Sequence, residues 1–165
     1  MKDQTGRIVV GYDGSSEAKR AVEWAARQAR RSGRGLTVLS VVDNGVMVGR
    51  GPGGPAHWWP DAAVEHANRV TEEGVEHACA AATGIDATGM TRMGPPAGLL
   101  VDASRTATLV VVGTRGRNAL VNLALGSVAA SVAAHAHCPV VVVRGVGDDQ
   151  PGPDNPVVVG IDSSV

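Results

Sequence analysis

The chain has 165 residues, of which 44% are apolar, and its formal net charge at pH 7 is −1. This length fits one domain, and an apolar fraction near the globular average of roughly 45–50% excludes an intrinsically disordered chain. The balanced charge excludes a basic nucleic-acid-binding protein.

The first part of the chain predicts a strand, a helix and a second strand. Residues 7–12 form a short β-branched run that stops at Asp13-Gly14-Ser15, which is typical of a buried strand. Ser15 or Ser16 can cap the following helix, whose alanine-rich face ends at Gly33. Residues 36–42 form the second predicted strand.

The alternation of strand and helix continues after an irregular region. Residues 44–60 are rich in glycine and proline, which predicts a loop. The segments that follow are predicted as a helix at 61–82 with Ala67, Val70, Gly74 and Ala78 on one face, a strand at 85–93, a helix at 97–105, a strand at 108–113, a helix at 127–135 and a strand at 138–144.

Continuous apolar strands that alternate with helices indicate an α/β fold with Rossmann-like layers. We expect a doubly wound parallel sheet of five strands, covered by helices on both faces. Right-handed crossovers allow the strand order 3-2-1-4-5 or 2-1-3-4-5, and the pattern does not choose between them. In either order, ligands bind beyond the carboxyl ends of the strands, where the winding reverses.

The end of the chain repeats its beginning. Residues 157–164 match residues 8–15 at five of eight positions. We therefore expect a domain at 1–145, a linker at 146–156 that is rich in Gly, Asp and Pro, and the first strand of a truncated second repeat at 157–165. Chance similarity of a strand and turn is the alternative interpretation.

A glycine pattern marks the main candidate site. Gly113-x2-Gly116-x9-Gly126-Ser127 follows the most apolar strand and precedes a helix. Glycines let the backbone approach a ligand closely, and a helix N-terminus presents N–H groups to phosphate oxygens. The spacing fits neither the Walker loop nor the Gly-x-Gly-x-x-Gly dinucleotide motif. Two ordinary glycine turns are the alternative.

On these residues the chain resembles the universal stress protein family. The segments that carry the resemblance are Gly113-x2-Gly116-x9-Gly126-Ser127-Val128, Cys138-Pro139 before four valines, Val9-Val10-Gly11-Tyr12-Asp13-Gly14-Ser15, and Gly94-Pro95-Pro96-Ala97. The resemblance covers about residues 6–145. It implies the strand order 3-2-1-4-5, with ATP across the ends of the first and fourth strands.

The resemblance also implies roles for individual residues. Gly11 and Asp13 would flank adenine and ribose, Val41 would pack against adenine, and Gly113, Arg115 and Gly116 would line the ribose-phosphate side. Gly126, Ser127, Val128 and Ala129 would offer backbone N–H groups to the β- and γ-phosphates. Many members have Ser or Thr where this chain has Ala129, so one phosphate contact would be lost. Mg²⁺ is expected with the ATP, bound mostly through phosphates and waters.

The implied function is that of an ATP-binding stress regulator whose nucleotide occupancy alters its dimer state or its binding to a regulatory protein. The resemblance implies a homodimer through the fifth strands, Val140–Val143. At most slow ATP hydrolysis is expected, because the sequence shows no base arranged to activate a nucleophile. The alternatives are a dimeric interaction module without nucleotide, or an adenylate-forming or nucleotidyl-transferring enzyme, whose His-x-Gly-His and Ser-Gly-Gly-x-Asp-Ser motifs are absent.

Histidines and cysteines are interpreted as structural. His135 and His137 lie at a helix end, where they suit the helix dipole better than a metal site. Cys79 and Cys138 are expected to be small core residues, and two cysteines cannot form a disulfide scaffold.

Three glutamates and two tryptophans complete the prediction. Glu72, Glu73 and Glu76 are expected on a solvated helix face. Trp58 and Trp59 are expected to anchor their loop or contact another subunit, with a nucleotide lid as the less favoured role. The N-terminus lacks a signal-peptide pattern and the chain lacks a run of about 18 apolar residues, so a cytoplasmic protein without membrane contact is expected.

Overall fold

The computed structural model describes residues 5–43, 61–114, 116 and 125–145 of the chain. In these residues, strands and helices alternate as the sequence predicts. The elements are β1 (Ile8–Gly11), α1 (Ser16–Ser32), β2 (Leu36–Val42), α2 (Asp61–Ala81), β3 (Ala87–Met93), α3 (Pro96–Ala103), β4 (Leu109–Gly113), α4 (Ser127–His135) and β5 (Val140–Val143).

The five strands form one parallel sheet. Their order is β3-β2-β1-β4-β5, which confirms the doubly wound sheet and selects between the two orders that the pattern allows. In the centre of the sheet, Val10 of β1 is paired with Val38 of β2 on one side and with Val111 of β4 on the other.

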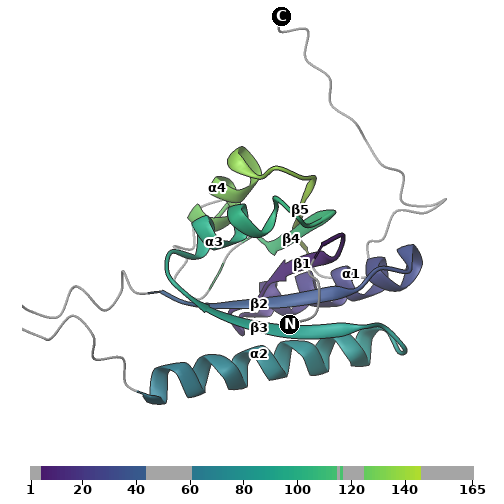
Figure 1. The fold of residues 1–165 in the computed structure, drawn as a ribbon, viewed down its shortest axis with the longest axis horizontal. Helices are drawn as coiled ribbons and strands as arrows, with labels where there is room; N and C mark the ends of the chain where they lie inside the picture. The colour runs from purple at the N-terminus through teal and green to yellow at the C-terminus, as the bar shows by residue number, and fades with distance from the viewer. Residues whose placement is uncertain (1–4, 44–60, 115, 117–124, 146–165) are drawn as a thin grey trace, which may run out of the picture.

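Helices cover both faces of the sheet. Figure 1 shows α2 on one side of β2 and β3, and α3 and α4 on the opposite side. Side chains alternate across a strand, so neighbouring residues of β1 enter different cores. Val10 packs with α1 and α2 in a first apolar cluster, whereas Val9 packs with α3 and α4 in a second one.

Helix α1 is set close to the sheet by its small side chains and its caps. Its alanine-rich face is fully buried, as the spacing predicts. The Ser15 hydroxyl accepts a hydrogen bond from the N–H of Ala18 at 3.2 Å and caps the N-terminus. Gly33 ends the helix with φ 64°, a left-handed conformation that favours glycine.

A buried arginine connects the beginnings of β1, β2 and β3 at the amino-terminal edge of the sheet, and no pattern in the sequence indicates it. Arg7 is 7% exposed. Its guanidinium donates to Thr37 Oγ1 and to the carbonyls of Leu36 and Asp86, and it forms an ion pair with the Asp86 carboxylate. A Cβ at Gly35 would overlap this guanidinium, so a larger residue there would displace Arg7 from these partners.

The two cysteines differ from each other. The prediction of a core position for Cys79 is wrong: Ala78 faces the sheet, and Cys79, one position further around α2, is exposed. Cys138 is half-buried against the second cluster, and burial raises the pKa of its thiol. Among the helices of the described ranges, none is long and apolar enough to cross a bilayer.

Candidate functional site

The winding of the sheet reverses between β1 and β4. From β1 the chain crosses to β2 and β3 on one side, then returns past β1 to β4 and β5 on the other. In a doubly wound sheet this reversal leaves a crevice at the carboxyl ends of the two strands. The segments after β1 and after β4, which contain Asp13 and Gly116, therefore meet at this edge.

Asp13 is held in a turn directly after β1. Its Oδ1 accepts a hydrogen bond of 3.0 Å from the N–H of Ser15, the residue that caps α1. Its Oδ2 faces Gly116, where an added Cβ would lie only 2.6 Å away. The structure thus brings together Asp13 and Gly116, as expected for two residues lining one crevice.

Gly113 ends β4 against the first turn of α1. A Cβ at position 113 would lie 2.8 Å from the carbonyl carbon and 2.9 Å from the carbonyl oxygen of Glu17. These are backbone atoms of a helix and cannot move aside cheaply. Glycine at 113 therefore allows the last residue of β4 to contact α1 directly, which fixes the geometry of the crevice.

The N-terminus of α4 is tied to the same edge. The N–H of Gly126, the N-cap, donates to the carbonyl oxygen of Thr114 at 2.7 Å. Within the described residues, no side chain caps α4 and no acceptor is recorded for the N–H groups of Ser127, Val128 and Ala129. The Ala129 side chain is 3% exposed and packs into the second cluster. The side chain of Ala129 is thus directed into the core.

Gly11 and Val41 lie on the α3 side of the sheet. A Cβ at Gly11 would lie 3.2 Å from Cδ1 of Leu100, so this end of β1 is packed against α3. Val41 is half-buried against the second cluster. The N–H of Gly94 donates to the carbonyl of Val42 at 3.0 Å, which brings the segment before α3 to the end of β2.

Several predicted residues lie outside the described residues. Arg115, Trp58 and Trp59 belong to this group, as do the linker at 146–156 and the repeat at 157–165. Their predicted roles remain predictions.

The two histidines show no sign of a metal site. Nδ1 of His135 lies 2.8 Å from the carbonyl oxygen of Ser131 in the last turn of α4, and the N–H of His137 donates to Ser104 Oγ at 2.8 Å. Over the described part of the chain, no group of three or more His, Cys, Asp or Glu side chains is arranged to hold a metal ion.

The glutamates of α2 divide into two kinds. Glu72 and Glu76 are exposed, as the solvated-face prediction requires. For Glu73 that prediction is incomplete, because its carboxylate accepts a 3.1 Å hydrogen bond from the hydroxyl of Tyr12 and lies 2.9 Å from Lys19 Nζ. No helical periodicity signals such a contact with a residue 61 positions away.

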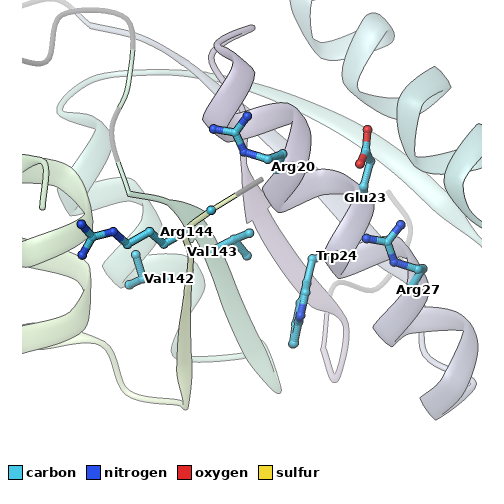
Figure 2. Close-up of a pocket in the computed structure, with 8 residues that line it drawn as sticks. Arg20, Glu23, Trp24, Arg27, Val142, Val143 and Arg144 are labelled. Atoms are coloured by element: carbon cyan, nitrogen blue, oxygen red, sulfur yellow. The ribbon is translucent and has the colours of Figure 1, made fainter. Parts of the chain in front are cut away.

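A hollow of about 150 Å³ lies between α1 and the carboxyl end of β5, where Val143 is paired with Gly113 of β4. Figure 2 shows Trp24 and three charged side chains projecting from α1, opposite the end of β5. Its lining residues are Arg20, Glu23, Trp24, Arg27, Val142, Val143, Arg144 and Gly145.

Comparison with known proteins agrees with the fold. The sequence profile of the universal stress protein family matches residues 4–144. The chain belongs to the universal stress protein family. A universal stress protein of Mycolicibacterium smegmatis is 37% identical over 169 residues, and one of Mycobacterium tuberculosis is 36% identical over 170 residues. Each alignment covers 95% of this chain and 54% of the relative, so the chain spans about half the length of these relatives.

Solved structures of the family share the architecture. The universal stress protein UspA of Lactobacillus plantarum has a TM-score of 0.68 at 26% identity and covers 87% of this chain and 100% of its own. A universal stress protein solved in complex with cAMP has a TM-score of 0.62 at 29% identity and covers 84% of this chain and 96% of its own. At least one relative of this fold therefore binds an adenine nucleotide.

Proposed function

We propose that this universal stress protein binds ATP in the crevice between the ends of β1 and β4. The observation that carries the proposal is the meeting of Asp13 with Gly116 at the edge where Thr114 holds the N-terminus of α4. A carboxylate, close-approach glycines and uncapped helix N–H groups converge there. Carboxylates accept hydrogen bonds from ribose hydroxyls, and helix N-termini favour phosphates.

The α4 N-terminus supports the phosphate end of the ligand. The N–H groups of Ser127, Val128 and Ala129 have no side-chain cap and lie at the positive end of the helix dipole. Arg115 is proposed, by family resemblance, to add positive charge. Because the described residues hold no cluster of metal-ligating side chains, accompanying Mg²⁺ would be held chiefly by the phosphates and water.

The apolar surface at the other end supports adenine as the base. Val41 is half-buried near the end of β2. The carbonyl of its neighbour Val42 accepts a hydrogen bond from the N–H of Gly94, which lies in the segment before α3. A partly exposed valine offers an aromatic base a flat apolar contact. The cAMP complex of a relative at 29% identity supports an adenine nucleotide, and the helix N-terminus favours one with a phosphate chain.

The experiment first denatures freshly purified protein and identifies any released nucleotide by mass spectrometry. ATP is then titrated into the wild type and Gly126→Val by calorimetry. Valine suits the extended backbone of residue 126, with φ −73° and ψ 158°, but adds bulk beside the N–H groups. We expect Gly126→Val to bind ATP at least about tenfold more weakly than the wild type, which corresponds to the loss of roughly one charge-assisted hydrogen bond.

Ala133→Val is the matched control, because it introduces the same side chain on the exposed face of the same helix. It should bind ATP like the wild type. If folded wild-type protein neither carries nor binds ATP, the proposal fails, and an interaction module without nucleotide becomes the better account.

We propose further that β5 mediates self-association and that bound ATP alters the association state. Among the described strands, none pairs with the outer edge of β5. The carbonyls of Pro139 and Val143 accept from β4, and since backbone groups alternate in direction, those of Val140 and Val142 point to the open edge. For regulation, ATP must bind the two association states with different affinity.

This second proposal is tested by sedimentation velocity with and without ATP. Val142→Pro removes an outward N–H that the fold of the monomer does not use, and edge strands tolerate proline. The matched variant Val142→Thr keeps that N–H. We expect a dimer for wild type and Val142→Thr and a monomer for Val142→Pro; a monomeric wild type at all concentrations contradicts the proposal.

A further inference from the structure

Four side chains form a polar cluster beside the crevice, at the seam of β1, α1 and α2. Glu73 Oε1 is its centre. It accepts from the Tyr12 hydroxyl at 3.1 Å, lies 2.9 Å from Lys19 Nζ and lies 3.3 Å from His77 Nε2. The ring of His77 also meets the ring of Tyr12 edge-on, with centroids 6.4 Å apart.

Tyr12 is the buried member of this cluster. It is 3% exposed, and its N–H donates to the carbonyl of Leu39 at 2.9 Å, one residue beyond the end of β1. Its ring fills the space left by Gly74 of α2, where a Cβ would lie 2.7 Å from Tyr12 Cδ1. The ring is therefore clamped between β2 and α2, and the bond to Glu73 fixes its outer end.

Tyr12 directly precedes Asp13. The Asp13 carboxylate is held by the N–H of Ser15 on one oxygen and faces Gly116 with the other. Since Tyr12 and Asp13 share a peptide bond, a displacement of Tyr12 as a whole would move the peptide that carries Asp13. A connected path thus runs from Glu73 on α2, through Tyr12, to the carboxylate in the crevice.

We propose that Glu73 is a positioning residue of the nucleotide site, acting through Tyr12 to fix the Asp13 carboxylate. The inference rests on the proposed function. Glu73 touches neither the crevice nor a ligand, and it binds Lys19 of α1 at the same time. Glu73 therefore helps to fix the positions of two elements that border the site, the turn after β1 and helix α1.

The charges of the cluster explain why a carboxylate suits this place. The Glu73 carboxylate accepts a hydrogen bond from the Tyr12 hydroxyl and forms an ion pair with the Lys19 ammonium group. A glutamine amide would keep the hydrogen bond to Tyr12 but would lose the ion pair with Lys19. The Lys19–Glu73 pair is more than one-third exposed on both sides, so it contributes little by itself. The buried hydroxyl of Tyr12 is the contact expected to matter for the site.

The test is a mutant cycle on ATP affinity measured by calorimetry at pH 7, with urea unfolding of each variant. Tyr12→Phe deletes only the hydroxyl, and Glu73→Ala deletes its acceptor. Each should weaken ATP binding by about five- to tenfold, and the double variant should lose no more than either alone, because both remove one contact. Glu73→Gln should recover most of the affinity, and Glu76→Ala, exposed on the same helix, should bind like the wild type.

Two results would overturn the inference while leaving ATP binding intact. Unchanged ATP affinity in Tyr12→Phe and Glu73→Ala, with lower stability in urea, would make the cluster purely structural. Additive losses in the double variant would mean that the residues do not act through one contact. A wild type that binds no ATP overturns the proposed function, and the inference falls with it.

Discussion

The carboxylate of Asp13 lies against Gly116 so closely that a Cβ at position 116 would be 2.6 Å from Oδ2. The two residues are far apart in the chain, and they meet because β1 and β4 are neighbours at the point where the sheet reverses its winding. This contact joins the strand-end carboxylate to the glycine pattern in one crevice.

Gly116→Ala tests this contact. The added methyl group must displace the Asp13 carboxylate, which the N–H of Ser15 otherwise holds. We expect ATP binding to weaken about tenfold, with a stability change within about 0.5 kcal/mol because residue 116 is exposed. Gly98→Ala, whose Cβ would make an ordinary 3.4 Å contact with Pro95, is the control. Unchanged ATP affinity in Gly116→Ala would separate Asp13 from the site.

Gly74→Ala tests the packing of α2 on the sheet. Its Cβ would lie 2.7 Å from Tyr12 Cδ1 and 2.8 Å from Val38 Cγ1, both buried. Overpacking costs about 1–3 kcal/mol, and the higher helix propensity of alanine returns up to about 1 kcal/mol. We expect a net loss of about 1–2 kcal/mol in urea unfolding. A stabilised Gly74→Ala would show that α2 can move away from the sheet freely.

Arg7→Met tests the buried arginine at the amino-terminal edge. It removes the donor to Thr37 and the partner of Asp86, and it deletes one of two donors to each of the carbonyls of Leu36 and Asp86, which keep the bonds from Thr88 and from the N–H of Leu36. We expect a loss of about 1–3 kcal/mol in urea unfolding, because buried hydrogen bonds are lost while the remaining Asp86 carboxylate is half exposed to water. Arg34→Met is the control, since Arg34 is exposed and donates only to the Gly6 carbonyl among the described residues. Equal losses for both variants would contradict a special role for burial.

The pH dependence of stability tests the environment of Glu73. The hydrogen bond from Lys19 lowers the pKa of Glu73 from its ordinary value of 4.5, against the opposing effect of burial, and His77 and Tyr12 lower it further. A lowered pKa in the folded state stabilises the protein above the unfolded pKa, and this contribution disappears as the pH falls through the folded value.

The wild type should therefore exceed Glu73→Gln in unfolding free energy by more at pH 7 than at pH 3. Urea unfolding at the two pH values measures this difference, with Glu76→Gln as the control. A difference that grows on acidification would have the wrong sign.

Most of the fold could be predicted because the spacing of apolar residues along the chain indicates which segments form helices and which form strands. Ala67, Val70, Gly74 and Ala78 repeat at helical spacing and are buried on α2, and four consecutive valines form β5. The periodicity was less decisive at element ends. The third strand begins at Ala87 rather than at Ile85, because Gly84 turns the chain with φ 78° and Asp86 bonds to Arg7.

The candidate site could be predicted in part, for a different reason. Asp13, Gly113 and Gly126 follow strand ends or precede helices, and such positions meet at one edge of a parallel sheet. Contacts between side chains of different elements have no such signal. The bond between Tyr12 and Glu73 and the burial of Arg7 depend on the relative placement of helices and strands, which no local pattern encodes.

The most direct test of ATP binding in this crevice is the amide NMR spectrum of the ¹⁵N-labelled wild type during ATP titration. The account predicts the largest shift changes at Ser127, Val128, Ala129 and Gly116, and little change at Gly33 and Gly84 on the opposite edge of the sheet. Largest changes at the opposite edge, or no changes at millimolar ATP, would contradict it.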